Sequence, residues 1–142
     1  MSSSEAQAAP TVPAMAAPKC GLVAYLQVDG AIAAARFYEK AFGAEIAAMH
    51  APDEQGRTMH VHLYINGASL MLADFYPDHG QPKVPHQGFS LALMVTDIEK
   101  RFQRAVDAGC TATLPVQKMF WGDLYGQLKD PYGVDWAMNQ GA

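Results

Sequence analysis

The sequence predicts an α+β fold in which two βαβββ modules form a cupped, eight-stranded mixed sheet. Several short segments alternate apolar and polar residues, which is the period of a half-buried strand. Two further segments carry apolar residues at helical spacing and end at a glycine. Equivalent positions in the two halves lie 65 to 67 residues apart, which indicates that one unit occurs twice.

The first half contains the signals of one helix and four strands. We expect strands over 22–28, 44–50, 59–65 and 68–74 and a helix over 31–42. Asp29-Gly30 precedes the helix, and Gly43 stands where a left-handed residue would end it. Asn66-Gly67 predicts a tight two-residue hairpin between the last two strands.

The second half repeats this order. We expect strands over 90–95, 111–116, 125–129 and 134–139 and a helix that begins at Ile98 and ends before Gly109. Asp97 is the expected N-cap of that helix. The repeat matches four positions of the first half, Leu26, Val28, Phe37 and Gly43, with Leu93, Val95, Phe102 and Gly109. In each module one helix should cover one face of the sheet and leave the other face concave.

The domain organisation follows from composition. Residues 1–20 are rich in Ala, Pro and Ser and are expected to form a flexible arm. Residues 21–142 should form a single domain made of the repeats 21–75 and 88–140, joined by a Pro-, Gly- and His-rich connector. The arm lacks the basic start and unbroken apolar stretch of a secretory signal, so export is not supported.

Charge and hydropathy exclude several classes of partner. Ten basic against fourteen acidic residues give a formal net charge of -4, so the basic surface of a nucleic-acid-binding protein is missing. The longest apolar runs, such as 68–73, are far shorter than the roughly 20 residues that span a bilayer, so we expect no membrane partner. Two distant cysteines, Cys20 and Cys110, do not make a disulfide framework, which favours the cytoplasm.

Three motifs within this order carry a family resemblance: FYEKAFGAE, HVHLYINGASLMLAD and FWGDLYGQLKDPYGVDWAM. With the repeat, they resemble the glyoxalase/bleomycin-resistance group, also called the vicinal oxygen chelate superfamily, and most closely its PhnB-like branch. The likeness covers roughly 21–139. It implies a homodimer whose cup binds a small molecule. Relatives include metal-dependent lyases, isomerases and dioxygenases as well as resistance proteins that sequester a drug.

The resemblance also implies four metal-ligand positions, which contain His or Glu in the metal-dependent members. The matching residues here are Val23, Met71, Ser90 and Ala137. None of them supplies the imidazole or carboxylate that a divalent ion needs. We therefore expect no metal and no other cofactor. A non-family site for Zn or Fe on the histidine pair described next would need a neighbouring carboxylate, and the pattern places none there.

The candidate catalytic residues are His60, His62 and Tyr64. Alternation turns Met59, Val61, Leu63 and Ile65 toward the helix and these three residues toward the concavity. Two imidazoles on one face suit paired binding or proton transfer, although two partly exposed histidines without a role would give the same pattern. The candidate ligand-binding residues are Tyr25, Gln27, Met71, Asp74, Trp121, Tyr125 and Gln127. For Asp74 the competing interpretation is a turn cap, and for Trp121 it is core packing.

These observations favour a small-molecule-binding protein without the family metal. If it is an enzyme, general acid-base chemistry by His60, assisted by Tyr64 or His62, is the mechanism to test first. The alternatives are a drug-sequestering resistance protein and a metal-dependent lyase, isomerase or dioxygenase of the same superfamily.

Overall fold

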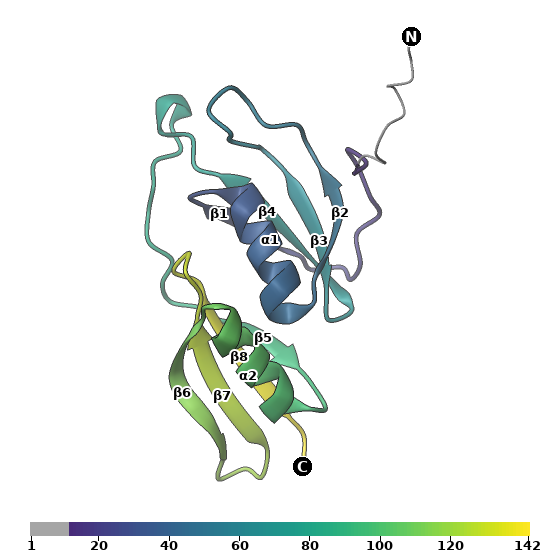
Figure 1. Ribbon diagram of the computed structural model, residues 1–142, viewed down its shortest axis with the longest axis vertical. Helices are drawn as coiled ribbons and strands as arrows, with labels where there is room; N and C mark the ends of the chain where they lie inside the picture. The colour runs from purple at the N-terminus through teal and green to yellow at the C-terminus, as the bar shows by residue number, and fades with distance from the viewer. Residues whose placement is uncertain (1–11) are drawn as a thin grey trace.

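The computed structural model describes residues 12–142, which contain two βαβββ modules one after the other (Figure 1). The first module consists of β1 (Ala24–Val28), α1 (Ala31–Phe42), β2 (Glu45–Met49), β3 (Val61–Ile65) and β4 (Ala68–Asp74). The second consists of β5 (Leu91–Met94), α2 (Ile98–Ala108), β6 (Thr111–Lys118), β7 (Leu124–Lys129) and β8 (Asp135–Gln140). A connector with one short 3-10 helix, η2 (Pro77–His79), joins them. The predicted α+β fold is confirmed.

Each module forms its own four-stranded mixed sheet. The strand orders are β1-β4-β3-β2 and β5-β8-β7-β6, so the two sheets have the same topology. The first and last strands of each module pair in parallel, and the remaining neighbours are antiparallel. Figure 1 shows the sheets one after the other along the long axis, with α1 and α2 on the same side of them. The eight expected strands are therefore present as two sheets of four.

The helices are packed by the faces that the sequence pattern indicates. In the first module Val61, Leu63 and Leu72 are fully buried beneath α1. In the second, Phe102 of α2 lies over Gly126, where an added Cβ would be only 2.7 Å from the Phe102 ring. A side chain at position 126 would therefore collide with the Phe102 ring, and only glycine fits there. We call the opposite face of each sheet, which points away from its helix, the inner face.

One hydrophobic core runs through both modules. The side chains of α1 and α2 contact each other, and the buried cluster includes residues of both halves. At its centre Tyr38 of α1 stacks edge-on against Trp136 of β8, with ring centroids 5.3 Å apart. The buried carboxylate of Asp130 accepts hydrogen bonds from the Tyr38 hydroxyl and, at 2.9 Å, from the Trp136 indole. Burial, followed by the charge of Asp130, raises the pKa of Tyr38 well above its ordinary value.

The hairpin of the first module also contacts the second. Asn66 and Gly67 are the two loop residues between β3 and β4, both with positive φ (50° and 83°), as the Asn-Gly signal predicted. The Asn66 amide donates to the Met94 carbonyl at 2.9 Å and accepts from Arg101 of α2 at 2.9 Å. The turn therefore connects the modules as well as closing a hairpin.

One local expectation was wrong and another holds in part. Met59 was expected to pack against the helix, but β3 begins two residues later and the Met59 side chain is 66% exposed. Asp97 is the N-cap residue of α2, as expected, but its side chain makes no capping hydrogen bond. Instead the Gln140 side-chain oxygen, at the end of β8, accepts from the backbone N–H of Ile98 at 2.9 Å. The cap comes from a distant strand, which local sequence patterns do not reveal.

Residues 12–19, which we call the strap, contain no helix or strand but are held against the first sheet. The Met49 N–H donates to the Pro13 carbonyl at 2.9 Å, and the Ser69 N–H donates to the Lys19 carbonyl at 3.3 Å. Composition did not predict these contacts. The rest of the expected flexible arm, residues 1–11, lies outside the described residues. Within 12–142 no helix is long and apolar enough to cross a bilayer.

Candidate functional site

A hollow of about 350 Å3 lies on the inner face of the first module. It is lined by two residues of β1, one of β4, the residue before His60 and two residues of the connector: Tyr25, Gln27, Ala73, Met59, Tyr76 and Gln81. The connector closes one side, because the Gln27 amide donates to the Gln81 side-chain oxygen at 2.9 Å. The hollow therefore combines aromatic rings with amides that can donate and accept hydrogen bonds.

Tyr25 and His60 form a hydrogen-bonded pair beside this hollow. The Tyr25 hydroxyl lies 2.9 Å from the Met59 carbonyl and 3.0 Å from Nδ1 of His60. A carbonyl can only accept, so both bonds form together when the hydroxyl donates to Met59 and His60 donates from Nδ1–H. In that tautomer Nε2 of His60 keeps its lone pair and can accept a proton.

The surroundings of this pair favour its neutral forms. Burial, followed by the neighbouring imidazoles of His50 and His62, lowers the pKa of His60 below its ordinary value. The His50 ring centroid is 5.0 Å from that of His60, and the His62 centroid is 6.2 Å from it. Burial raises the pKa of Tyr25. His60 is therefore a neutral base at physiological pH, with a fixed ring orientation.

His62 and Tyr64 share the inner face with His60 but lie beneath the strap. His62 is fully buried, and its Nε2 is 2.7 Å from the Ser69 hydroxyl. The Tyr64 hydroxyl donates to the Ala17 carbonyl of the strap at 2.6 Å. Of the three candidate catalytic residues, only His60 contacts a side chain that lines the hollow, that of Tyr25, while the other two are occupied by contacts with the strap and β4.

The remaining candidate ligand-binding residues fall into two groups. Tyr25, Gln27 and Met71 are on the first sheet, where Met71 lies opposite Tyr25 and His62 in the strand ladders. Trp121, Tyr125 and Gln127 are on the second, in the β6–β7 hairpin and β7. Trp121 is half exposed, and its ring centroid lies 6.1 Å from that of Tyr125. The Gln127 amide donates to the Tyr125 hydroxyl at 3.0 Å. Within 12–142 no hydrogen bond or ring contact joins the two groups.

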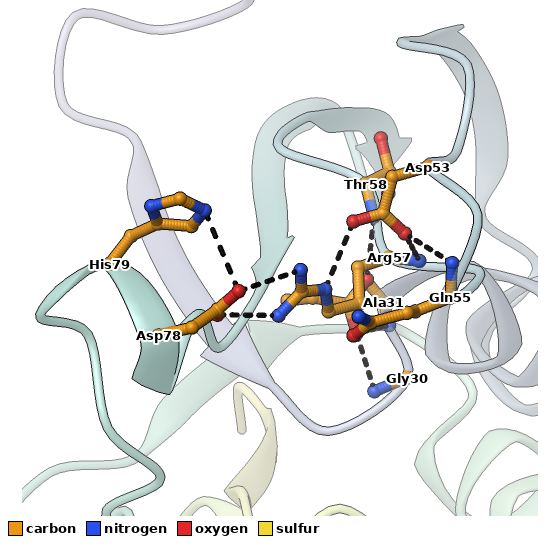
Figure 2. Close-up of polar contacts among 9 residues, drawn as sticks. Gly30, Ala31, Asp53, Gln55, Arg57, Thr58, Asp78 and His79 are labelled. Carbon is orange, nitrogen blue, oxygen red and sulfur yellow. Dashed lines mark hydrogen bonds and ion pairs between the residues drawn. The ribbon is translucent and has the colours of Figure 1, made fainter.

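Asp74 has a structural position at the end of β4. Its carboxylate is buried and accepts from the N–H groups of Gly30 and Ala31 at 2.8 and 3.0 Å, which caps α1. Its second oxygen accepts from the Thr58 N–H at 2.8 Å. Figure 2 labels the three residues that donate these N–H groups, Gly30, Ala31 and Thr58. No oxygen of Asp74 is left without a donor, so its geometry does not favour a ligand contact.

A second charged cluster beside Asp74 fixes the loop before β3. Arg57 donates to Asp53 at 3.0 Å and to both oxygens of Asp78 at 2.8 and 3.3 Å, as Figure 2 shows. Its guanidinium also lies 4.4 Å from the centre of the Tyr76 ring. The hydrogen bond from the Arg57 backbone N–H, followed by that from its side chain, lowers the pKa of Asp53, and the Arg57 side-chain hydrogen bonds lower the pKa of Asp78. The charges of this cluster are already paired with one another. Its contact with the Tyr76 ring positions Tyr76 and the connector at the hollow.

The four family metal positions do not fit a metal ion. Met71 is on the inner face of β4, and Ala137 is buried on β8, but neither carries a nitrogen or oxygen ligand in its side chain. Val23 and Ser90 stand just before the first strand of each module and lack imidazole or carboxylate as well. Among residues 12–142, no three His, Cys, Asp or Glu side chains are grouped so that they could hold a metal ion.

Sequence reasoning missed three residues that border the site: Tyr76, Gln81 and His50. The first two belong to the segment interpreted only as a connector, and an isolated bridge between them folds it back over β1. His50 follows β2 and packs against His60 because β2 and β3 pair. The Pro- and Gly-rich composition of the connector does not indicate that it folds back. Predicting that β2 pairs with β3 would have placed His50 beside His60.

Comparisons with known proteins agree with this architecture. The family model described as "Glyoxalase/Bleomycin resistance protein/Dioxygenase superfamily" matches residues 20–138. The uncharacterized protein Rv0887c of Mycobacterium tuberculosis is 38% identical over 123 residues, which cover 82% of this chain and 71% of that protein.

Two solved structures have the same fold. Protein PA1353 of Pseudomonas aeruginosa is 26% identical with a TM-score of 0.70, and the match covers 84% of this chain and 96% of that one. A Bacillus cereus structure described as a putative 3-demethylubiquinone-9 3-methyltransferase, PhnB protein, is 22% identical with a TM-score of 0.66, and the match covers 86% of this chain and all of that one.

Proposed function

Because the chain belongs to the glyoxalase/bleomycin resistance protein/dioxygenase superfamily, we propose that it binds a small organic molecule on the inner face of its first module, without a metal ion. The observation that carries this proposal is the hollow of about 350 Å3 beside the Tyr25–His60 pair. Its rings offer apolar contact area, and its amides and the His60 imidazole offer hydrogen bonds. The side chains at the family metal positions support metal-free binding.

Native mass spectrometry tests this proposal. The full chain is incubated with a panel of uncharged and carboxylate-bearing aromatic compounds, and we expect at least one of them to bind one per chain. Tyr25→Ala and His60→Ala should weaken binding by about tenfold, since the first removes a ring that lines the hollow and the second removes the imidazole that holds this ring by a hydrogen bond. Gln103→Ala, on the exposed side of α2, is the matched control and should bind normally. Equal binding by all variants would place the ligand elsewhere.

Elemental analysis tests the absence of the metal independently. After expression with added Zn, Ni, Mn and Fe, we expect far less than one metal ion per chain. A near-stoichiometric metal content would contradict the proposal and support the metal-dependent alternative.

A second candidate function, general acid-base catalysis, is favoured by one specific observation. The Tyr25 contact leaves Nε2 of His60 as a free base, and burial keeps the imidazole neutral at pH 7. A bound compound whose mass changes on incubation would support turnover, and an unchanged mass at full occupancy would support sequestration. His60→Ala should then abolish the mass change, whereas unchanged turnover would remove His60 from the mechanism.

We also propose that two copies of the chain assemble to complete the cup. In one chain the candidate ligand-binding side chains lie on two separate sheets. In the proposed dimer the second module of one chain would lie against the first module of the other, which would bring the two groups together. Phe120 and Met94 are strongly exposed on the second module, which supports a covered surface there. Light scattering should give twice the mass of one chain, and Phe120→Ser should shift the protein toward one chain. A purely monomeric protein at micromolar concentration would contradict this assembly.

We place the protein in the cytoplasm. Both cysteines, Cys20 and Cys110, are free thiols, which suits a reducing compartment. Cell fractionation tests this: recovery from the extracellular or periplasmic fraction would contradict it.

A further inference from the structure

The strap covers an imidazole that has only half of its hydrogen bonds. His62 is fully buried, and while its Nε2 contacts Ser69, its Nδ1 has no hydrogen-bond partner within residues 12–142. Buried polar atoms without partners are rare and costly. The neutral ring tolerates this, because in one of its two tautomers Nδ1 is only an unused acceptor. A protonated ring needs an acceptor at each nitrogen, and the Ala16 backbone offsets its burial only in part.

Among residues 12–142, the surroundings of His62 offer no charge that would stabilise its protonated form. On its own strand it faces the rings of His60 and Tyr64, and on β4 it faces Ser69 and Met71. On β2 its neighbour is Ala48. From the strap it meets the backbone of Ala16. The cation of the strap, Lys19 Nζ, lies 4.1 Å from the centre of the adjacent Tyr64 ring.

Two more titratable groups stand at the edges of this environment. Glu45, opposite Tyr64 in the β2–β3 ladder, is exposed to solvent and is screened there. His50 packs against His60 and would add a second positive charge when protonated. Neither group therefore compensates a charge on His62, and His50 acts in the opposite direction.

The strap itself is held weakly. Apart from half-buried Ala16, its side chains are exposed, so it contributes almost no apolar burial of its own. Its attachment consists of few hydrogen bonds, at Pro13, Ala17 and both backbone groups of Lys19. Segments with exposed side chains and few buried contacts open at low free energy. The strap can therefore leave the sheet without unfolding the core.

We propose that the strap is a latch that opens when His62 is protonated, so that mildly acidic solution uncovers His62, Tyr64 and Ser69 on the inner face of the first module. The direction of this pH effect follows from the linkage between protonation of His62 and opening of the strap. Burial lowers the pKa of His62, while the Ala16 backbone opposes this only in part. A proton thus binds more tightly to the open state, and the closed state loses stability as the pH falls below about 6.5. The inference does not depend on the proposed ligand site.

Amide hydrogen exchange of the full chain between pH 7.5 and 5 tests the latch. The Met49 and Ser69 amides, which donate to the strap carbonyls, report its opening directly. After correction for the intrinsic exchange rate, we expect their protection to fall severalfold in acid, up to tenfold for each unit by which burial lowers the pKa. The Val95 amide, bonded to Asn139 in the second module, should keep its protection and serves as the reference.

Two variants separate the latch from general loosening. His62→Gln can still bond Ser69 but cannot titrate, so its protection should not change with pH. His50→Gln keeps the buried imidazole and should respond like the native chain. An equal acid response in His62→Gln, or unchanged protection in the native chain, would overturn the proposal.

A measurement on the native ring covers the case in which His62→Gln does not fold. Linkage requires that a weaker latch raise the pKa of His62, so Tyr64→Phe, which loses the bond to Ala17, should shift the His62 titration in NMR toward the ordinary value. A His62 titration that is identical in both proteins would also overturn the proposal.

Discussion

The inner face of the first module is covered by a strap and rich in imidazole, whereas that of the second is open and carries aromatic, amide and paired charged side chains. On the second face Lys129 and Asp135 form an exposed ion pair at 2.9 Å, and Tyr125 and Gln127 stand beside it. The helix faces, in contrast, are apolar in both modules. The two modules therefore share the kind of face that buries the helices and differ in the inner faces.

The same contrast exists at the helix N-termini. Asp74 and Gln140 end the last strands of their modules, 66 residues apart, and each accepts a hydrogen bond from the start of its own module's helix. Asp74 is charged, buried and bonded to three backbone N–H groups, whereas Gln140 is neutral, half-buried and bonded to one. One position in the repeat therefore carries an anchor in the first module and an ordinary cap in the second.

The largest effect should come from this pair of positions. Asp74→Ala leaves three backbone donors without an acceptor and should lower the free energy of unfolding by about 3 kcal/mol or more. Gln140→Ala removes a single neutral bond and should cost about 1 kcal/mol. Urea denaturation measures both. Equal losses would mean that the two caps are equivalent after all.

A smaller effect is expected at the hairpin that joins the modules. Asn66→Ala loses the bonds to Met94 and Arg101. It also places at positive φ a residue that tolerates the left-handed conformation less well than Asn. The combined cost should be about 2 kcal/mol. Asn66→Gly keeps the backbone relaxed and should cost less, which makes it the control. If both variants are as stable as the native chain in thermal denaturation, the hairpin does not connect the modules energetically.

A still smaller effect distinguishes the two inner faces. Tyr64→Phe removes the hydrogen bond to Ala17 and should increase tryptic cleavage after Lys19 by about fivefold, which corresponds to about 1 kcal/mol. Tyr125→Phe removes only its contact with Gln127 on the open face and should leave cleavage unchanged. Similar cleavage rates in the two variants would argue that Tyr64 does not hold the strap.

The smallest effect on stability comes from alkylation of the thiols. Burial, followed by the charge of Asp130, raises the pKa of Cys110 to about 12, so almost no thiolate forms there at pH 8. Cys20 is exposed. Iodoacetamide should therefore add one group per chain, at Cys20, without changing the melting temperature, and intact-mass analysis with peptide mapping checks this. Rapid labelling of Cys110 would show that the core beside Asp130 opens readily.

The sequence predicted the elements well because their signals are local. Helix α1 was predicted over its full length, since Gly43 marks its end, and the Asn-Gly pair located the β3–β4 hairpin. Alternation also placed His60, His62 and Tyr64 on the inner face. Within the site, however, the sequence could not distinguish a histidine beside a hollow from one beneath the strap. That difference depends on residues 12–19 and on the connector, whose folding back leaves no periodic pattern.

Asp74 illustrates the second limit. An acidic residue after a strand suits a turn, a ligand or a cap equally well, and its three donors come from positions 16 to 44 residues away. Gln140 has the same origin, because Ile98 is 42 residues from it in the chain. Such partners become visible only when the order of strands in the sheet is known.

The Asp130 carboxylate has a consequence for how the molecule melts. It binds Tyr38 from one half of the chain and Trp136 from the other inside a shared aromatic cluster. Either half alone would expose its rings of this cluster to water, and the first half alone would leave the Tyr38 hydroxyl without its acceptor. Despite its duplicated plan, the protein should therefore unfold as one cooperative unit, with a single peak in calorimetry and equal calorimetric and van't Hoff enthalpies.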